Sequence, residues 1–193
     1  GRFAAASPAA CLIALLAAGE LPVSTVLGAV QHAYFAESRP LDRDSAVAAA
    51  LRMEAEGADL LDVGGESTRP GAAPVSAADE LDRVVPVIQA LAGRLRIPIS
   101  IDTYKGAVAR ACLAEGAALV NDVTGLRRDE SLAGVVADGG AALVLTHSRG
   151  RSDDMYALAR YGDVVNEVTS ELAEGIHRAT AAGITRDRLI LDP

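Results

Sequence analysis

The sequence predicts an α/β protein made of repeated strand–helix units, and three observations support this fold class. Half of the 193 residues are hydrophobic, which suits a globular domain with a substantial core. A short pattern recurs along the chain, in which a helix end and a glycine are followed by an apolar run. Amphipathic segments separate these runs, so strands and helices are expected to alternate.

The repeated pattern has three close copies and one looser copy. They are "AEGADLLDV" (55–63), "AEGAALVNDV" (114–123), "ADGGAALVLTH" (137–147) and "AAGITRDRLILDP" (181–193). One glycine in each copy is expected to take the left-handed conformation that closes a helix, namely Gly57, Gly116, Gly139 and Gly183.

The apolar runs have four to six residues and do not alternate with polar residues, so they predict strands buried on both faces. Strands are expected near residues 25–31, 60–63, 98–102, 119–122, 142–147 and 189–192. Between them, one helical stripe comprises Leu81, Val84, Val85, Ile88 and Leu91, with Ser76 and Asp79 as a cap. A second stripe comprises Val165, Val168, Leu172, Ile176 and Ala179.

About six strand–helix units fit either a doubly wound open sheet or part of a (β/α)8 TIM barrel. No glycine-rich dinucleotide loop follows the first strand, which favours the barrel. A complete barrel needs about 250 residues, and this chain stops at Pro193 directly after a strand, so we expect the last two units to be missing. The expected organisation is an N-terminal extension over residues 1–23 and an incomplete barrel domain over residues 24–193.

Composition argues against several classes of partner. The formal net charge of −8 is unfavourable for nucleic acid, which is bound by clustered Lys and Arg. The apolar run from Ala9 to Ala18 is too short to span a membrane. Cys11 and Cys112 have no Cys or His neighbour at metal-binding spacing, so we expect no disulfide framework and a cytoplasmic location.

Polar residues stand at the C-terminal ends of the predicted strands. They are Asp62, Asp102, Asn121 with Asp122, His147 and Asp192. Any one of them could be a helix cap, but the active site of a TIM barrel lies where these ends converge. Carboxylates accept two N–H donors each and an amide offers one donor and one acceptor, which suits a fused heterocycle. Their negative charge would also stabilise a cationic transition state.

The segment "GGESTRPG" (64–71) is the second candidate feature. Two glycines directly after a strand predict close approach of the backbone to a ligand. Ser67 and Thr68 offer hydroxyls, and Arg69 offers a fork that suits phosphate or carboxylate. Pro70 and Gly71 predict a fixed turn.

Four segments resemble the dihydropteroate synthases, folate-pathway enzymes of the pterin-binding barrel superfamily. They are "GADLLDVGGESTRPGA", "ISIDTYKGAVA", "ALVNDVTG" and "LILDP", and the resemblance runs from about Leu41 to Pro193. It implies condensation of a pterin methyl diphosphate with 4-aminobenzoate, with Mg²⁺ assisting the departure of diphosphate. It also implies a homodimer for the complete protein.

The resemblance assigns a role to each matching residue. Asp102, Asn121 and Asp192 correspond to the groups that hold the pterin. Thr68 and Arg69 correspond to the loop that meets the diphosphate, which makes them catalytic candidates together with Asp102. Pro70 would line the aminobenzoate pocket, and Asp62 would support the loop from below.

The chain departs from the family at two places. The first loop reads "GAVQHAYFAESRP" (28–40), so Gln31 replaces the metal-side Asn and is the candidate metal ligand. Thr146 and Ser148 replace two methionines beside the pterin pocket, and polar groups there need partners. His147 between them receives no role from the resemblance.

Two alternatives remain open at this stage. Another pterin-binding barrel, such as a methyltetrahydrofolate methyltransferase, shares the Asp and Asn strand ends but lacks the ESTRPG segment. A non-catalytic paralogue that binds pterin or a partner protein would explain the altered first loop.

Overall fold

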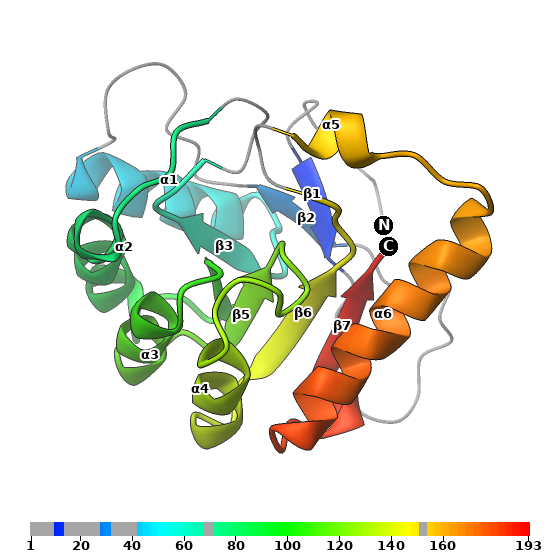
Figure 1. Ribbon diagram of the computed structural model, residues 1–193. Coiled ribbons are helices and arrows are strands. Elements are labelled where there is room, and N and C mark those ends of the chain that lie inside the picture. Colours follow the sequence, from blue (N-terminus) through cyan, green and yellow to red (C-terminus); the bar gives the residue numbers. More distant parts are fainter. Residues whose placement is uncertain (1–9, 14–27, 32–41, 68–71, 151–153) are drawn as a thin grey trace.

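The computed structural model describes residues 10–13, 28–31, 42–67, 72–150 and 154–193, with the backbone alone in the first two ranges. Its main feature is a five-stranded parallel sheet in which consecutive strands are neighbours (Figure 1). The strands are β3 (Leu61–Gly64), β4 (Ile99–Asp102), β5 (Leu119–Asp122), β6 (Ala142–Thr146) and β7 (Leu189–Asp192). This order is that of one arc of a (β/α)8 barrel, and the arc is not closed.

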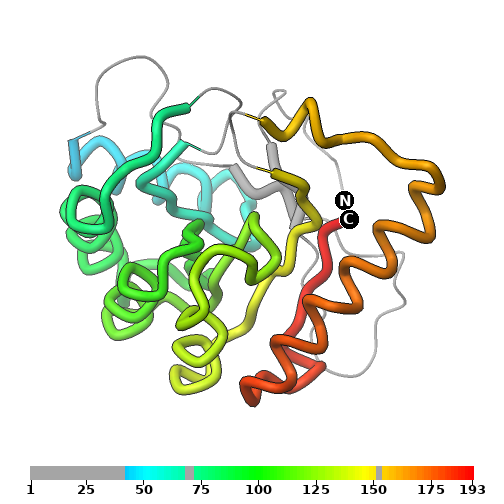
Figure 2. The backbone as a smooth tube through the Cα atoms, viewed as in Figure 1, coloured from blue at the N-terminus to red at the C-terminus, as the bar shows by residue number. Residues whose placement is uncertain are grey.

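Helices precede β3 and connect the strands of the sheet. They are α1 (Arg43–Ala55), α2 (Ala77–Leu91), α3 (Gly106–Ala114), α4 (Leu132–Asp138), α5 (Met155–Leu158), α6 (Val164–Ala181) and the 3-10 turn η1 (Arg186–Arg188). Each of α1 to α4 packs against the next, so they form one layer along the sheet, and α6 lies beside β6 and β7 (Figures 1 and 2). The predicted α/β class with crossover helices is confirmed. No helix in the described part of the chain is long and apolar enough to cross a membrane.

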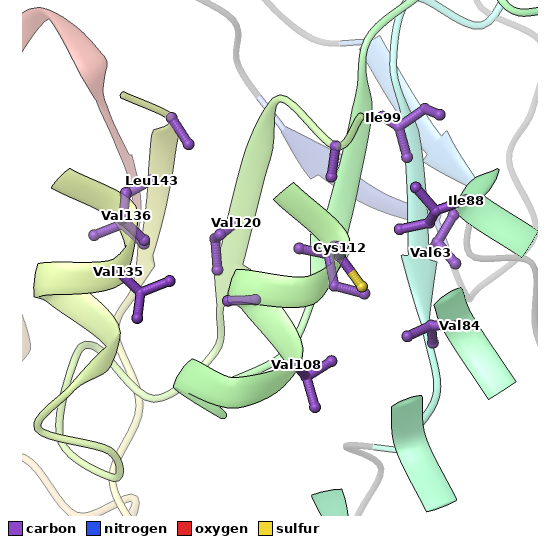
Figure 3. Close-up of a cluster of buried hydrophobic side chains, with 14 of the residues drawn as sticks. Val63, Val84, Ile88, Ile99, Val108, Cys112, Val120, Val135, Val136 and Leu143 are labelled. Carbon is purple, nitrogen blue, oxygen red and sulfur yellow. The ribbon is translucent and has the colours of Figure 1, made fainter. Parts of the chain in front are cut away.

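The main core lies between the sheet and the layer of helices α1 to α4. Figure 3 shows strand residues such as Val63 and Val120 facing helix residues such as Ile88, Val108 and Cys112. Burial in this apolar layer raises the pKa of the Cys112 thiol to about 12, so the thiol packs as a small hydrophobic group. The predicted stripe of α2 contributes to this core, and Ser76 caps the helix by accepting a hydrogen bond from the Asp79 N–H at 3.1 Å.

The other face of the sheet carries a second apolar cluster. Leu60, Leu119, Val144 and Ile190 are buried there, while Leu143 and Leu145 on β6 face the main core. Neighbouring residues of one strand are therefore buried on opposite faces. This confirms the prediction, made from non-alternating apolar runs, that the strands are covered on both sides.

The strand predicted near residues 25–31 differs from expectation in its pairing. Its described part, β2 (Gly28–Gln31), is antiparallel to β1 (Ala10–Ile13) in a separate two-stranded sheet. Five strands rather than six therefore make up the parallel sheet in the described part of the chain. The physical reason is that all four residues of β2 pair in register with β1, which uses this edge for an antiparallel ladder. The boundary at residue 23 stays a prediction.

One of the predicted helix-closing glycines is corrected. Gly57, Gly116 and Gly183 have positive φ as expected, but Gly139 has φ −75° and the left-handed residue is Gly140 at φ 59°. The chain has two adjacent glycines there, and α4 keeps helical geometry through the first of them before it turns.

The predicted stripe of α6 is only partly buried. Ala179 is buried and Ile176 packs against the core, but Val165 is 70% exposed. The helix approaches β6 closely at Gly175, where an added Cβ would lie 3.7 Å from the Leu145 methyl groups. At the start of the helix Val164 is also exposed, at 53%, so the predicted stripe is covered only towards the C-terminal end of α6.

Candidate functional site

The C-terminal ends of the parallel strands bring the predicted polar residues into register. Asp102 of β4 pairs with Gly64 on one side and with Asn121 on the other, and Thr146 pairs with Asp192. Asp62, Asp102 and Asn121 are all buried. The structure therefore gathers three sequence-predicted residues at one end of the sheet, with Asp192 two strands further along.

Asp62 and Asn121 form a buried pair. The Asn121 Nδ2 group donates a hydrogen bond to Asp62 Oδ2 at 3.0 Å. The carboxylate fixes which way the Asn121 amide points, because only the Nδ2 side can donate to it. The supporting role that the family resemblance assigned to Asp62 stays a prediction, because residues 68–71 of the ESTRPG segment lie outside the described residues.

Asp102 is a buried carboxyl group surrounded by other acids. Burial raises its pKa well above the ordinary value, and the charges of Asp62, Glu80 and Asp122 raise it further. Such a carboxylate gains more than an exposed one from N–H donors, because each donor replaces solvation that burial has removed. The site therefore suits a ligand that presents N–H groups or positive charge.

Gly64, the last residue of β3, and Gly65 after it leave room for protein side chains. A Cβ at Gly64 would lie 3.2 Å from the Asp102 Cβ. A Cβ at Gly65 would lie 2.8 Å from the Glu80 Cγ and 2.9 Å from a Val84 methyl. Side chains of Asp102 and α2 fill the space that a Cβ would need at these two positions. The close approach to a ligand that the sequence predicted stays a prediction.

Glu66 connects the loop after β3 to the loop after β4. Its carboxylate accepts hydrogen bonds from the Tyr104 hydroxyl at 3.2 Å and from the Val75 N–H at 3.3 Å, and it pairs with the Lys105 ammonium. Lys105 also pairs with the buried Glu80. Sequence reasoning missed these residues, although the "IDTYK" segment contained two of them. The catalytic and pocket candidates Thr68, Arg69 and Pro70 lie outside the described residues.

Asp122 shapes the loop after β5. Its carboxylate accepts hydrogen bonds from the Thr124 N–H at 2.8 Å, the Thr124 hydroxyl at 2.6 Å and the Leu126 N–H at 2.5 Å. These contacts hold a turn in which Leu126 has a φ of 60°, a rare value for a residue with a side chain. Asp122 thus supports the loop, while Asn121 is the ligand candidate of the pair.

Thr146 is hydrogen-bonded to Asp192. Its hydroxyl donates a hydrogen bond to Asp192 Oδ2 at 3.3 Å. Burial raises the pKa of Asp192, and the hydrogen bond from Thr146 opposes that rise. The substitution of a thioether by a hydroxyl at this position therefore holds a pterin-binding candidate in place.

His147 is fixed by α6. Its Nε2 atom lies 2.9 Å from Glu171 Oε2, and its ring lies 6.0 Å from that of Tyr161. Arg149 also pairs with Glu171, bonds to Glu167 at 2.7 Å and stacks over Tyr161 at 4.1 Å. These contacts hold the end of β6 to α6, which gives His147 a structural partner that the sequence did not reveal.

A cavity of about 310 Å³ lies among the loops that follow strands β3 to β6. Tyr104 and Val123, which line it, each follow a buried polar residue by two positions. Arg128 and Arg149 also line it and are cations that sequence reasoning missed, because arginines in loops are common and carry little signal. The volume is that of a small-molecule site.

The possible metal-ligand atoms at the C-terminal ends of the strands are mainly oxygen atoms, the type that Mg²⁺ prefers. No group of three or more His, Cys, Asp or Glu side chains among the described residues could hold a metal ion alone. The candidate ligand Gln31 ends β2, and its side chain is outside the described part.

The parallel strand order and the buried polar residues at the strand ends define an α/β-barrel protein with a small-molecule site. A family model described as pterin binding enzyme matches residues 26–193, and the chain belongs to that family. Within it, the chain is similar to dihydropteroate synthases. The enzyme of Mycobacterium leprae is 46% identical over 169 residues, which are 87% of this chain and 59% of the relative. That of Bacillus subtilis is 39% identical over 150 residues, 78% of this chain and 50% of the relative.

Solved structures of dihydropteroate synthases are similar to this chain as well. The Yersinia pestis dihydropteroate synthase in a sulfonamide drug complex has a TM-score of 0.77 at 41% identity, covering 80% of this chain and 56% of that one. The Burkholderia cenocepacia enzyme complexed with 7,8-dihydropteroate has a TM-score of 0.71 at 46% identity, covering 79% and 54%. The chain thus spans about half the length of the relatives it matches.

Proposed function

We propose that this protein is a dihydropteroate synthase, which joins 6-hydroxymethyl-7,8-dihydropterin diphosphate to 4-aminobenzoate in folate biosynthesis. The observation that carries the proposal is the buried cluster in which Asn121 is oriented by Asp62 and lies beside Asp102 in the sheet. This cluster offers oriented acceptors to the N–H groups of a pterin ring, and a family match over residues 26–193 supports the same ligand class.

The residues act on the pterin in two ways. Asp102, Asn121 and Asp192 hold the ring, and the carboxylates stabilise the positive charge that develops when the bond between the pterin methylene carbon and the diphosphate oxygen breaks. The electron pair of that bond leaves with diphosphate, the aminobenzoate nitrogen forms the new bond to the methylene carbon, and the nitrogen then loses a proton. Thr68 and Arg69 are proposed to meet the diphosphate, with Pro70 beside the aminobenzoate.

Mg²⁺ is part of the proposal. This ion is commonly bound through one or two protein oxygens, waters and the substrate's phosphates, so it requires no cage made by protein alone. Gln31, with its amide oxygen, is the proposed protein ligand at the end of β2. When bound, Mg²⁺ would neutralise charge on the departing diphosphate.

Diphosphate release tests the function directly. Full-length protein is incubated with pterin diphosphate, 4-aminobenzoate and Mg²⁺, and diphosphate is measured with and without aminobenzoate. Release that depends on aminobenzoate is expected. Pterin binding without release would contradict the enzyme and favour the non-catalytic paralogue, which the altered segment 28–40 motivates. The methyltransferase alternative gains no support from the relatives named above.

We further propose a cytoplasmic homodimer that does not bind nucleic acid. The net charge of −8 supports the last point, since phosphate backbones repel an acidic surface. Light scattering of the full-length protein, alone and with DNA, tests both the dimer and the lack of nucleic-acid binding.

A further inference from the structure

Lys105 is the only lysine in the sequence, and every other basic side chain apart from histidine is an arginine. It stands three residues after Asp102, directly before α3. Its side chain is 14% exposed and lies between Glu66 and Glu80, which are 10% and 1% exposed. An ammonium is a compact charge that can sit between two carboxylates, whereas a guanidinium needs the room of a planar fork.

Glu80 is the inner end of this group. It lies on α2, and its Cγ passes through the space that the missing side chain of Gly65 leaves free. Burial by itself would lower the pKa of Lys105, but hydrogen bonds to Glu66 and Glu80 outweigh burial and raise it, so the lysine stays charged. A buried ion pair is a weak source of stability compared with apolar packing. We therefore look for the role of this ion pair in positioning the residues around it.

Glu66 is the outer end of the group and the base of a loop. It accepts a hydrogen bond from the Val75 N–H at 3.3 Å, nine positions further along the chain, so it joins the two described ends of the loop. That loop includes Thr68 and Arg69 in the sequence. The Tyr104 hydroxyl also donates a hydrogen bond to the Glu66 carboxylate, at 3.2 Å.

We propose that Lys105 is a positioning residue, which links Glu80 in the interior to Glu66 and thereby fixes the base of the ESTRPG loop relative to Asp102. The strand end that carries Asp102 and the described base of the loop at Glu66 are then connected through a single ammonium group. This role rests on the proposed function for its catalytic consequence, but the loop attachment itself can be measured without turnover.

Hydrogen exchange followed by mass spectrometry tests the attachment in the full-length protein. The variants are Lys105→Met, Lys105→Met combined with Glu80→Gln, and Glu66→Gln. In the double variant the buried Glu80 no longer carries a charge without a partner, so the melting temperature should return towards that of the unaltered protein. The attachment of the loop through Lys105 should stay lost. We expect amides of residues 65–76 to exchange at least tenfold faster in all three variants, with β6 and α4 unchanged in the double variant. Arg43→Met, which removes an exposed cation on α1, is the matched control and should change nothing.

A second readout separates positioning from general stability. In the double variant, KM for aminobenzoate should rise about tenfold or kcat should fall, while calorimetric affinity for a pterin without diphosphate stays within twofold. Unchanged exchange in residues 65–76, or equal acceleration in every segment, would overturn the proposal. If the unaltered protein releases no diphosphate, the proposed function fails, and the exchange result still decides whether Lys105 holds the loop.

Discussion

At the C-terminal ends of the strands, the polar residues of β3 to β5 are held by different interactions from those of β6 and β7. On the β3–β5 side, Asp62, Asp102 and Asn121 are buried, and Asn121 donates a buried hydrogen bond to Asp62. On the β6–β7 side, Asp192 is held by Thr146, and the end of β6 is held to α6 by contacts of His147 and Arg149 with acidic side chains. The first arrangement resists salt and fluctuation, while the second depends on partly exposed charges.

The largest expected effect contrasts one substitution on the two sides. Val108 in α3 is fully buried and Val165 in α6 is 70% exposed. Val108→Ala should lower the free energy of unfolding by roughly 2–3 kcal/mol, because two buried methyl groups are lost and a cavity remains. Val165→Ala should change it by less than about 0.5 kcal/mol. Urea unfolding of both variants measures this, and equal losses would show that α6 is covered as α3 is.

Asp102→Asn should separate function from stability on the buried side. Loss of a charge-assisted acceptor should weaken pterin binding by roughly 1–3 kcal/mol, measured by calorimetry. The raised pKa of Asp102, caused first by burial and then by neighbouring acids, means that its ionised form destabilises the fold. Stability from this group falls as pH rises above the ordinary carboxyl range, so the variant should melt higher than the unaltered protein at pH 7. Unchanged pterin affinity would count against the site assignment.

Gly65→Ala tests how tightly the buried side is packed. Its Cβ would meet Glu80 and Val84 inside 3 Å, so we expect a loss of about 1–2 kcal/mol in unfolding free energy. The control is Gly134→Ala in α4, where nothing lies within 4 Å of the new Cβ. That variant should be stabilised by up to about 1 kcal/mol, because alanine favours the helix. Thermal melts of both compare the two glycines, and a neutral Gly65→Ala would show that Glu80 can move away.

The smallest effect is expected on the β6–β7 side. Hydrogen bonds from Arg149, and to a lesser extent from His147, lower the pKa of Glu171 to about 2, even though some burial opposes this. A lowered carboxyl pKa adds stability above the unfolded value of about 4.3 and loses it as pH falls towards 2. Glu171→Gln should cost less than about 1 kcal/mol at pH 7, since the pair is partly exposed.

Salt and pH check that expectation. Unfolding of the unaltered protein between pH 4.5 and 2 should show a loss that Glu171→Gln lacks, and the difference at pH 7 should shrink in 1 M salt. If 1 M salt left the stability difference between the two proteins unchanged, the Glu171 ion pairs would be as buried as the polar residues of β3 to β5.

Much of the site could be predicted because each strand end is a local pattern. The apolar runs predicted β3 to β7 within one or two residues, and the polar residues of these runs stand at or near the strand ends. The pairing of β2 was not predictable in this way, since its four residues fit an antiparallel partner as well as a parallel one. The exposure of Val165 depends on where α6 leaves the sheet, which periodicity does not encode.

The sequence by itself determined the alternation of strands and helices, the double-sided burial of the strands and the residues at their ends, because these follow from periodicity and residue type. Only the tertiary structure decided which side chains these residues bind. Asn121 meets Asp62 across 59 positions, Lys105 meets Glu80 across 25 and His147 meets Glu171 across 24. Such contacts depend on how far a side chain reaches once the strands are in register, and no local pattern contains that distance.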